Sequence, residues 1–284
     1  MAKTQTTAVT EVKKGALVAP AFLDAADYGQ GFEGADKDSY AIPFLQVLQK
    51  MSPMADEDSD KYVDGAKAGM IYNTVTGKLY DVRETPMTII QCYYKRSFIR
   101  WAPRDAGGGF KGEVTPEEMD RIIAAKEVEN VDGKLLVKDA DGKVDAKKSD
   151  YYSDTRSHYV IAIDPETNEA LPAILSLAST QIKPSKNLLT SLSNNKVEVD
   201  GQKRTPPTFA NKITLTTASA SNDKGSWALV QFKLAGLVDD AELYAEAKKF
   251  YGAVVSGAAN ADYSKTSDAG DAPVSGQPST ADKF

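Results

Sequence analysis

Fifteen consecutive residues, MTIIQCYYKRSFIRW at positions 87–101, constrain the fold of this chain more than any other segment. The run is rich in β-branched and aromatic residues, which favour strands, and it contains no acidic residue. It predicts the clearest β-strand in the sequence. We therefore interpret the rest of the chain around that strand.

Other short β-prone segments predict further strands. They comprise a hairpin within residues 69–82 around Thr76-Gly77, and strands at His158–Ile163, Leu171–Leu177, Lys212–Thr217 and Trp227–Leu237. Apolar residues at helical spacing predict four short helices. These are a helix through Phe44, Leu45, Leu48 and Met51, two helices near Pro116–Lys126 and Ser185–Ser193, and a last helix capped by Asp239 with Glu242 three residues on.

Short strands, one long insertion and helices at the margins favour a mainly β (α+β) fold over βαβ units. The specific expectation is an OB-like antiparallel barrel, and a sandwich is the alternative. Residues 39–257 would form this domain, with 105–156 as a charged insertion. Residues 1–38 are predicted to form a flexible arm. Residues 258–284 are low in apolar residues and are predicted to form a disordered tail.

The counts of chemically reactive residues exclude several functions. With one cysteine, Cys92, and one histidine, His158, the chain lacks an internal disulfide and the ligands of an ordinary zinc site. Common nucleotide-binding and hydrolase motifs are absent, and His158 is more typical of a structural imidazole than of a base. We interpret the acidic segment at residues 56–60 as a solvated loop. We therefore expect no enzyme, catalytic residue, metal or cofactor.

No segment predicts a membrane span or export. The longest mostly apolar stretch, Ala170–Ala178, is far shorter than the roughly 20 residues that cross a bilayer. The N-terminus also lacks the apolar region of a signal peptide. We expect a soluble cytoplasmic protein.

Charge is distributed unevenly, although the net charge is −6. On the predicted strand at 87–101, Tyr94, Arg96, Phe98 and Arg100 share one face and alternate rings with guanidinium groups. This pattern suits a binder of single-stranded nucleic acid, because rings stack on bases while cations neutralise phosphates. Alternatively, the rings face the core and the arginines pair with acids elsewhere.

A second basic segment, residues 181–217, carries six basic residues against two acidic ones. Lys183, Lys186 and Lys212 are the candidate phosphate contacts here, and Lys212 lies on the polar face of a predicted strand. Trp227 is an outward ring on the last predicted strand. It either stacks on bases or closes the end of the barrel by packing.

The tail ends in Asp282, Lys283 and Phe284 and is weakly acidic. An acidic arm that ends in an aromatic residue either competes for a basic groove on the same chain or presents its ring to partner proteins. Asp282 and Phe284 are therefore candidate contacts with partner proteins. A spacer without such a role is the alternative.

Several segments together resemble a known phage family. The runs IPFLQVLQKMSP, GAKAGMIYNTVTGKLYD, CYYKRSFIRWAPR and KGSWALVQFKLAGLVDDAELYAEAKKFY look like those of single-stranded-DNA-binding proteins of tailed bacteriophages. The resemblance covers roughly residues 39–104 and 205–257. It implies an OB fold, a flexible tail ending in an aromatic, and a binding strand that carries Tyr94, Arg96, Phe98, Arg100 and Trp101. The resemblance also implies contacts of the tail residues Asp282 and Phe284 with replication proteins, although the tail of this chain is less acidic than is usual for such proteins.

Two functions follow as hypotheses. The first is a non-catalytic, sequence-tolerant single-stranded-DNA-binding protein of phage DNA replication and recombination. The second is a phage structural or interaction protein that binds no nucleic acid, in which the basic strand is an ordinary edge strand.

Overall fold

The computed structural model describes residues 41–223 and 225–266, with six separate positions between residues 22 and 33. The chain divides into two compact units, 1–39 and 40–284, and every element named below belongs to the second. Strands hold 39% of the described residues and helices 22%, so the mainly β class is confirmed. The arm 1–38 and the tail residues Asp282 and Phe284 lie outside the described residues, apart from the six positions.

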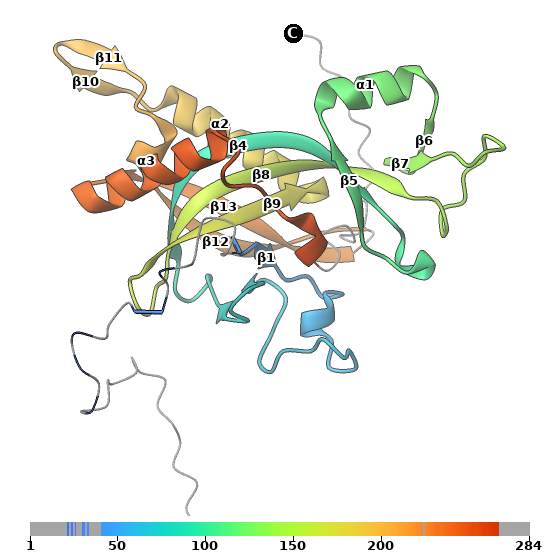
Figure 1. The fold of residues 1–284 in the computed structure, drawn as a ribbon, viewed down its shortest axis with the longest axis horizontal. Helices are drawn as coiled ribbons and strands as arrows, with labels where there is room; N and C mark the ends of the chain where they lie inside the picture. The colour runs from blue at the N-terminus through green and yellow to red at the C-terminus, as the bar shows by residue number, and fades with distance from the viewer. Residues whose placement is uncertain are drawn as a thin grey trace, which may run out of the picture. The chain divides into compact units, whose positions relative to one another are not determined.

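One large antiparallel sheet organises the fold (Figure 1). Its strands are β4 (Met87–Trp101), β5 (Phe110–Val114), β6 (Val128–Val131), β7 (Lys134–Val137), β8 (Tyr151–Ile163), β9 (Ala170–Ala178), β12 (Asn211–Asn222) and β13 (Gly225–Leu237). They lie in the order β13-β12-β4-β8-β7-β6, with β5 beside β4 and β9 beside β8. The strand predicted at 87–101 is confirmed as β4.

The long strands β4 and β8 form the centre of this sheet. They pair from Thr88 opposite Ile163 to Trp101 opposite Tyr151, with a bulge between Gln91 and Tyr93. Figure 1 shows both strands running from the end near α2 and α3 to the end that carries α1. Both ends of the sheet therefore share the same two strands.

Three α-helices within the described part of the chain cover the sheet, and the sequence predicted all three. They are α1 (Pro116–Ala124), α2 (Ile182–Asn194) and α3 (Ala241–Val255). Leu188 and Leu192 of α2 pack on one face, against a core that includes Val160. Phe250 of α3 packs on the opposite face, against a core that includes Tyr159. No helix among the described residues is long and apolar enough to cross a membrane.

The cap of α3 differs from the prediction. Asp240, one residue after the expected Asp239, accepts hydrogen bonds from the backbone N–H groups of Glu242 and Leu243. The carboxylate of Asp239 instead accepts a hydrogen bond from Lys212 at 2.7 Å.

The helix predicted through residues 44–51 is wrong. This segment contains β1 (Leu45–Val47), which pairs with β2 (Ile71–Asn73), and β2 pairs with β3 (Leu79–Tyr80). The predicted hairpin is confirmed as β2 and β3. Phe44, Leu45 and Leu48 enter three different hydrophobic cores. Their spacing therefore does not define one helical face.

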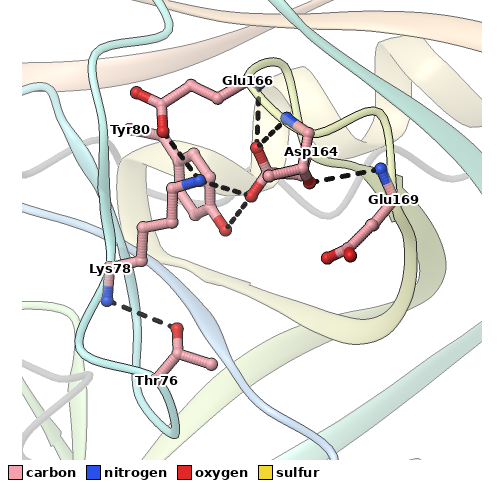
Figure 2. A network of polar contacts seen from close by, with 7 residues as sticks. Thr76, Lys78, Tyr80, Asp164, Glu166 and Glu169 are labelled. Atoms are coloured by element: carbon pink, nitrogen blue, oxygen red, sulfur yellow. Dashed lines mark hydrogen bonds and ion pairs between the residues drawn. The ribbon is translucent and has the colours of Figure 1, made fainter. Parts of the chain in front are cut away.

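A polar network around the buried Asp164 joins this small sheet to the turn between β8 and β9 (Figure 2). The ammonium of Lys78 lies 2.7 Å from Asp164 and 2.9 Å from Glu166, and the hydroxyl of Tyr80 donates to Asp164 at 3.2 Å. Burial opposes ionisation of Asp164, but hydrogen bonds from Lys78 and from two backbone N–H groups lower its pKa. Burial and the nearby Asp164 raise the pKa of Tyr80 to about 12.

Residues 105–156 do not stand apart from the fold. They supply β5, α1, β6 and β7, and the first six residues of β8. β5 pairs with β4 and β7 pairs with β8, so the expected insertion extends the sheet. Residues 195–205 hold a separate two-stranded hairpin, β10 (Val197–Val199) and β11 (Gln202–Arg204), which Figure 1 shows standing away from the sheet.

The ordered chain also continues past the predicted boundary at Gly257. Residues 258–266 are described and include the short 3-10 helix η6 (Tyr263–Lys265). Tyr263 is 1% exposed and belongs to the core beneath α3. Disorder from residue 258 onward is therefore wrong for 258–266, and 267–284 lie outside the described residues.

The sheets do not close into a barrel, so the OB-like barrel is not confirmed. β9 and β13 are outer strands of the curved part, and the side chain of Gln181, just after β9, bridges them. Its amide donates to the carbonyl of Ala228 at 2.7 Å and accepts from the N–H of Val230 at 2.9 Å. Gln49 makes a second pair of bonds to Ala228. Two amide side chains thus take the place of a neighbouring strand.

We predict that Gln181→Met lowers the free energy of unfolding by about 1–3 kcal/mol, because the buried N–H of Val230 loses its partner. Urea unfolding of the purified variant measures the change. Gln202→Met, at an exposed position of the β10–β11 hairpin, is the matched control and should unfold like the original protein. Equal stability of the two variants would contradict the role assigned to Gln181.

Candidate nucleic-acid interface

The row predicted on β4 exists, but its rings are not exposed. Phe98 packs in the core beneath α1 with Met119 and is 8% exposed. Trp101 is 2% exposed and belongs to the core on the other face of the sheet. Tyr94 is half-buried, with its ring 5.3 Å from that of His158. Phe98 and Trp101 are therefore not accessible stacking platforms.

The cations of β4 are paired with carboxylates. Arg96 makes two hydrogen bonds to Asp154 at 3.1 and 3.0 Å, and Arg100 binds Asp150 at 2.8 Å. The bond to Asp154 raises the pKa of Arg96, against the effect of partial burial. The furrow of exposed rings and unpaired arginines predicted along β4 is therefore not formed.

Asp154 is shared with a second arginine. Arg156 is 9% exposed, and its guanidinium lies 2.9 Å from Asp154 and 2.9 Å from the hydroxyl of Tyr94. The two arginines, Asp154 and Tyr94 thus form one network across β4 and β8. This network orders side chains in the middle of the sheet. Much of the positive charge of Arg96 and Arg156 is compensated within the protein by Asp154.

Lys212 lies on the opposite face of the sheet from Arg96 and Arg100. In the pairing of β12 with β4, Lys212 lies opposite Ile90, which belongs to the core under α3. Its ammonium pairs with Asp239 at 2.7 Å, and this hydrogen bond lowers the pKa of Asp239. Arg96, Arg100 and Lys212 therefore do not meet on one concave surface.

Trp227 is half-buried near the start of β13. Its indole Nε1 is shielded from solvent and has no hydrogen-bond partner among the described residues. The packing interpretation of this ring agrees with these observations better than the stacking one.

His158 is fully buried beneath α2. Its Nδ1 lies 2.8 Å from Gln91 Oε1 and its Nε2 lies 2.7 Å from Ser185 Oγ, so both ring nitrogens are satisfied. Burial, helped by the charge of Arg156, lowers the pKa of His158 to about 3. The imidazole is therefore neutral and structural, as its sequence context indicated.

We predict that the free energy of unfolding falls as the pH drops below about 6.5, by about 1.4 kcal/mol per pH unit. The folded pKa of His158 is depressed, so in this range only the unfolded chain takes up the proton. The contribution of neutral His158 to stability is fully present above the pKa of this group in the unfolded chain. It is lost as the pH falls toward the pKa of His158 in the folded protein. Urea unfolding between pH 7.5 and 5 tests this, and His158→Gln should flatten the slope. A flat profile for the unmodified protein would contradict it.

A groove of about 660 Å³ runs between α2 and the outer strand β13. Lys183 and Lys233 are its charged lining residues, and Lys186 is exposed one turn further along α2. None of the three lysines has an ion-pair partner in the described part of the chain. The half-buried ring of Phe232 also lines the groove, 6.2 Å from the ring of His158.

The walls of this groove contain no acidic residue. The helix α2 and the strands β12 and β13 carry lysines but neither Asp nor Glu along their full lengths. Polar lining comes from Asn187, Ser191, Thr214, Thr216 and Gln231. In a chain with 40 acidic residues, this is a local cationic surface that suits an anionic ligand.

Sequence reasoning identified Lys183 and Lys186 but not the groove that they border. Phe232, which packs against the core that includes Val160, and the exposed Lys233 both line this groove. The absence of acids from α2 and from the paired strands β12 and β13 is the signal that would have found it. Among the described residues, no group of three or more His, Cys, Asp or Glu side chains is arranged to hold a metal ion.

The fold and the groove define an antiparallel β protein with a lysine-lined surface. A family model described as Pam3 phage gp34-like protein matches residues 12–260, which is most of the chain. The protein therefore belongs to this phage family. No curated protein and no solved structure matches the chain.

Proposed function

We propose that this protein is a non-catalytic, sequence-tolerant single-stranded-DNA-binding protein that acts in phage DNA replication or recombination in the host cytoplasm. One observation carries the proposal: the groove between α2 and β13 has a half-buried ring, walls without acids, and lysines that have no ion-pair partner among the residues that the structure describes. Membership of a phage family agrees with this setting.

The chemistry of the groove suits a phosphodiester backbone. Lys183 and Lys233 neutralise phosphates, and the hydroxyl and amide side chains of the lining donate further hydrogen bonds to phosphate oxygens. Phe232 offers a ring on which a base can stack, an interaction that every base makes. Such contacts carry little sequence information, so the proposal includes sequence tolerance.

We also propose that the fold of this protein is OB-like. Five strands follow the spatial order β13-β12-β4-β8-β9. In the sequence, α2 lies between β9 and β12, the third and fourth of these strands in chain order. An OB fold is a five-stranded, partly open Greek-key barrel. The bridge of Gln181 between β9 and β13 supports this assignment, since it spans the opening between two outer strands.

The test is a titration of fluorescently labelled oligo-dT, followed by anisotropy at 50 and 200 mM salt. We expect binding at low salt that weakens steeply at higher salt, because cations released from phosphates drive association. A random-sequence oligonucleotide of equal length should bind with similar affinity. If neither oligonucleotide binds at low salt, the proposal is refuted.

The second candidate is a phage structural or interaction protein. The pairing of Arg96 and Arg100 with carboxylates favours it, because these residues then serve the sheet itself. Presence of the protein in purified phage particles, together with failure to bind oligo-dT, would support this alternative.

A further inference from the structure

Tyr263 fills a pocket made of other aromatic rings. Its ring is stacked on Phe110 at 6.0 Å with an interplanar angle of 22°, meets Trp101 edge-on at 6.3 Å, and lies 5.1 Å from Phe44. Trp101 and Phe110 come from the paired strands β4 and β5, and Phe44 comes from the segment just before β1. They form a slot whose geometry suits any flat aromatic group.

The floor of this slot is polar, which is unusual for a core. Ser157 of β8 lies opposite Ser176 of β9, and Ser97 of β4 lies on the same face. The hydroxyl of Tyr263 bonds that of Ser157. Ser97 is fully buried, and its Oγ has no hydrogen-bond partner among the described residues. A buried hydroxyl without a hydrogen-bond partner lowers the stability of the fold. The slot can therefore form more hydrogen bonds than the single phenol of Tyr263 uses.

The segment that brings Tyr263 into the slot is not part of the sheet. Residues 258–266 form no strand, and η6 is a single turn. The segment is tied to α3 by the backbone bond from Ala259 to Ala253. Withdrawal of Tyr263 would therefore break side-chain contacts but no strand pairing.

We propose that this slot is a nucleobase-binding site and that Tyr263 occupies it in the free protein. A base in the place of Tyr263 would stack on Phe110 and meet Trp101 edge-on. It would present several polar edge atoms to Ser97, Ser157 and Ser176, where tyrosine presents one hydroxyl. The inference rests on the proposed single-stranded-DNA binding and adds a second contact, on the sheet face beneath α3. Binding at this contact requires residues 258–266 to leave.

Hydrogen exchange on the full chain, with and without oligo-dT, tests the displacement. We expect the backbone amides of 258–266 to exchange about tenfold faster when oligo-dT is bound, whereas ligands ordinarily slow exchange. Unchanged or slower exchange in the bound complex would overturn the slot and leave the groove proposal standing. Failure of oligo-dT to bind at all would overturn both.

A cavity variant tests the chemistry of the slot separately. Tyr263→Ala should leave space that thymidine fills, so millimolar thymidine should raise the midpoint of thermal unfolding of the variant but not of the unmodified protein. The matched probe is p-cresol, which reproduces the lost side chain. Stabilisation by p-cresol without stabilisation by thymidine would show a simple tyrosine cavity and overturn the proposal. If the variant does not fold, the hydrogen-exchange result decides.

Discussion

Reversing the charge of Lys183 and Lys233 together should weaken oligo-dT binding about 100-fold at low salt. Each reversal beside a phosphate changes the interaction by on the order of 1.4 kcal/mol, which is a factor of ten. The salt dependence should also become shallower, by about 0.7 in the logarithmic slope for each lysine lost. Anisotropy titrations of Lys183→Glu/Lys233→Glu at several salt concentrations measure both effects.

The matched control is Lys147→Glu/Lys148→Glu, which makes the same change of net charge in an exposed loop far along the sequence from the groove. It should bind with nearly the original affinity. Equal weakening by both double variants would mean that only net charge matters, and the groove would lose its assigned role. Both lysines of the groove are surface residues, so folding should be preserved in each case.

Truncation after Gly257 should lower the free energy of unfolding by about 3–5 kcal/mol, the usual effect of removing a large buried aromatic side chain. The cause is the loss of Tyr263, which is 1% exposed and contacts three rings. Urea unfolding of the shortened protein measures the change. The expectation follows from packing alone and holds whether or not the slot also binds a base.

Truncation after Thr266 provides the comparison, because it keeps Tyr263 and the buried Thr266. This longer form should be as stable as the whole chain. Equal stability of the two truncated forms would show that residues 258–266 add little to the core.

The sheet was largely predictable from local sequence. The segment 87–101 and the turn at Thr76-Gly77 were recognised because β-branched and aromatic content and turn residues act locally. The failure at residues 44–51 has a physical cause: helical spacing implies one buried face, but Phe44, Leu45 and Leu48 enter three separate cores. Which core receives a side chain depends on distant strands.

The candidate site was less predictable, because exposure depends on tertiary partners. Alternation along β4 placed Arg96 and Phe98 on one face correctly. It did not reveal that Asp154 would pair with Arg96, or that α1 would cover Phe98. Tyr263 likewise lies in a stretch of low apolar content, where composition indicated disorder. Its burial follows from a slot assembled by residues more than 150 positions earlier.

Because β4 and β8 run beneath both α1 and α2, the two ends of the sheet share their central strands. Genetic exchange between related phages could not transplant one end as a ready-made module. A crossover within residues 87–163 would join halves of strands whose registers and side chains were selected in different backgrounds. We therefore expect this stretch to be inherited as a block, with natural variation by segment swapping confined to the chain on either side of it.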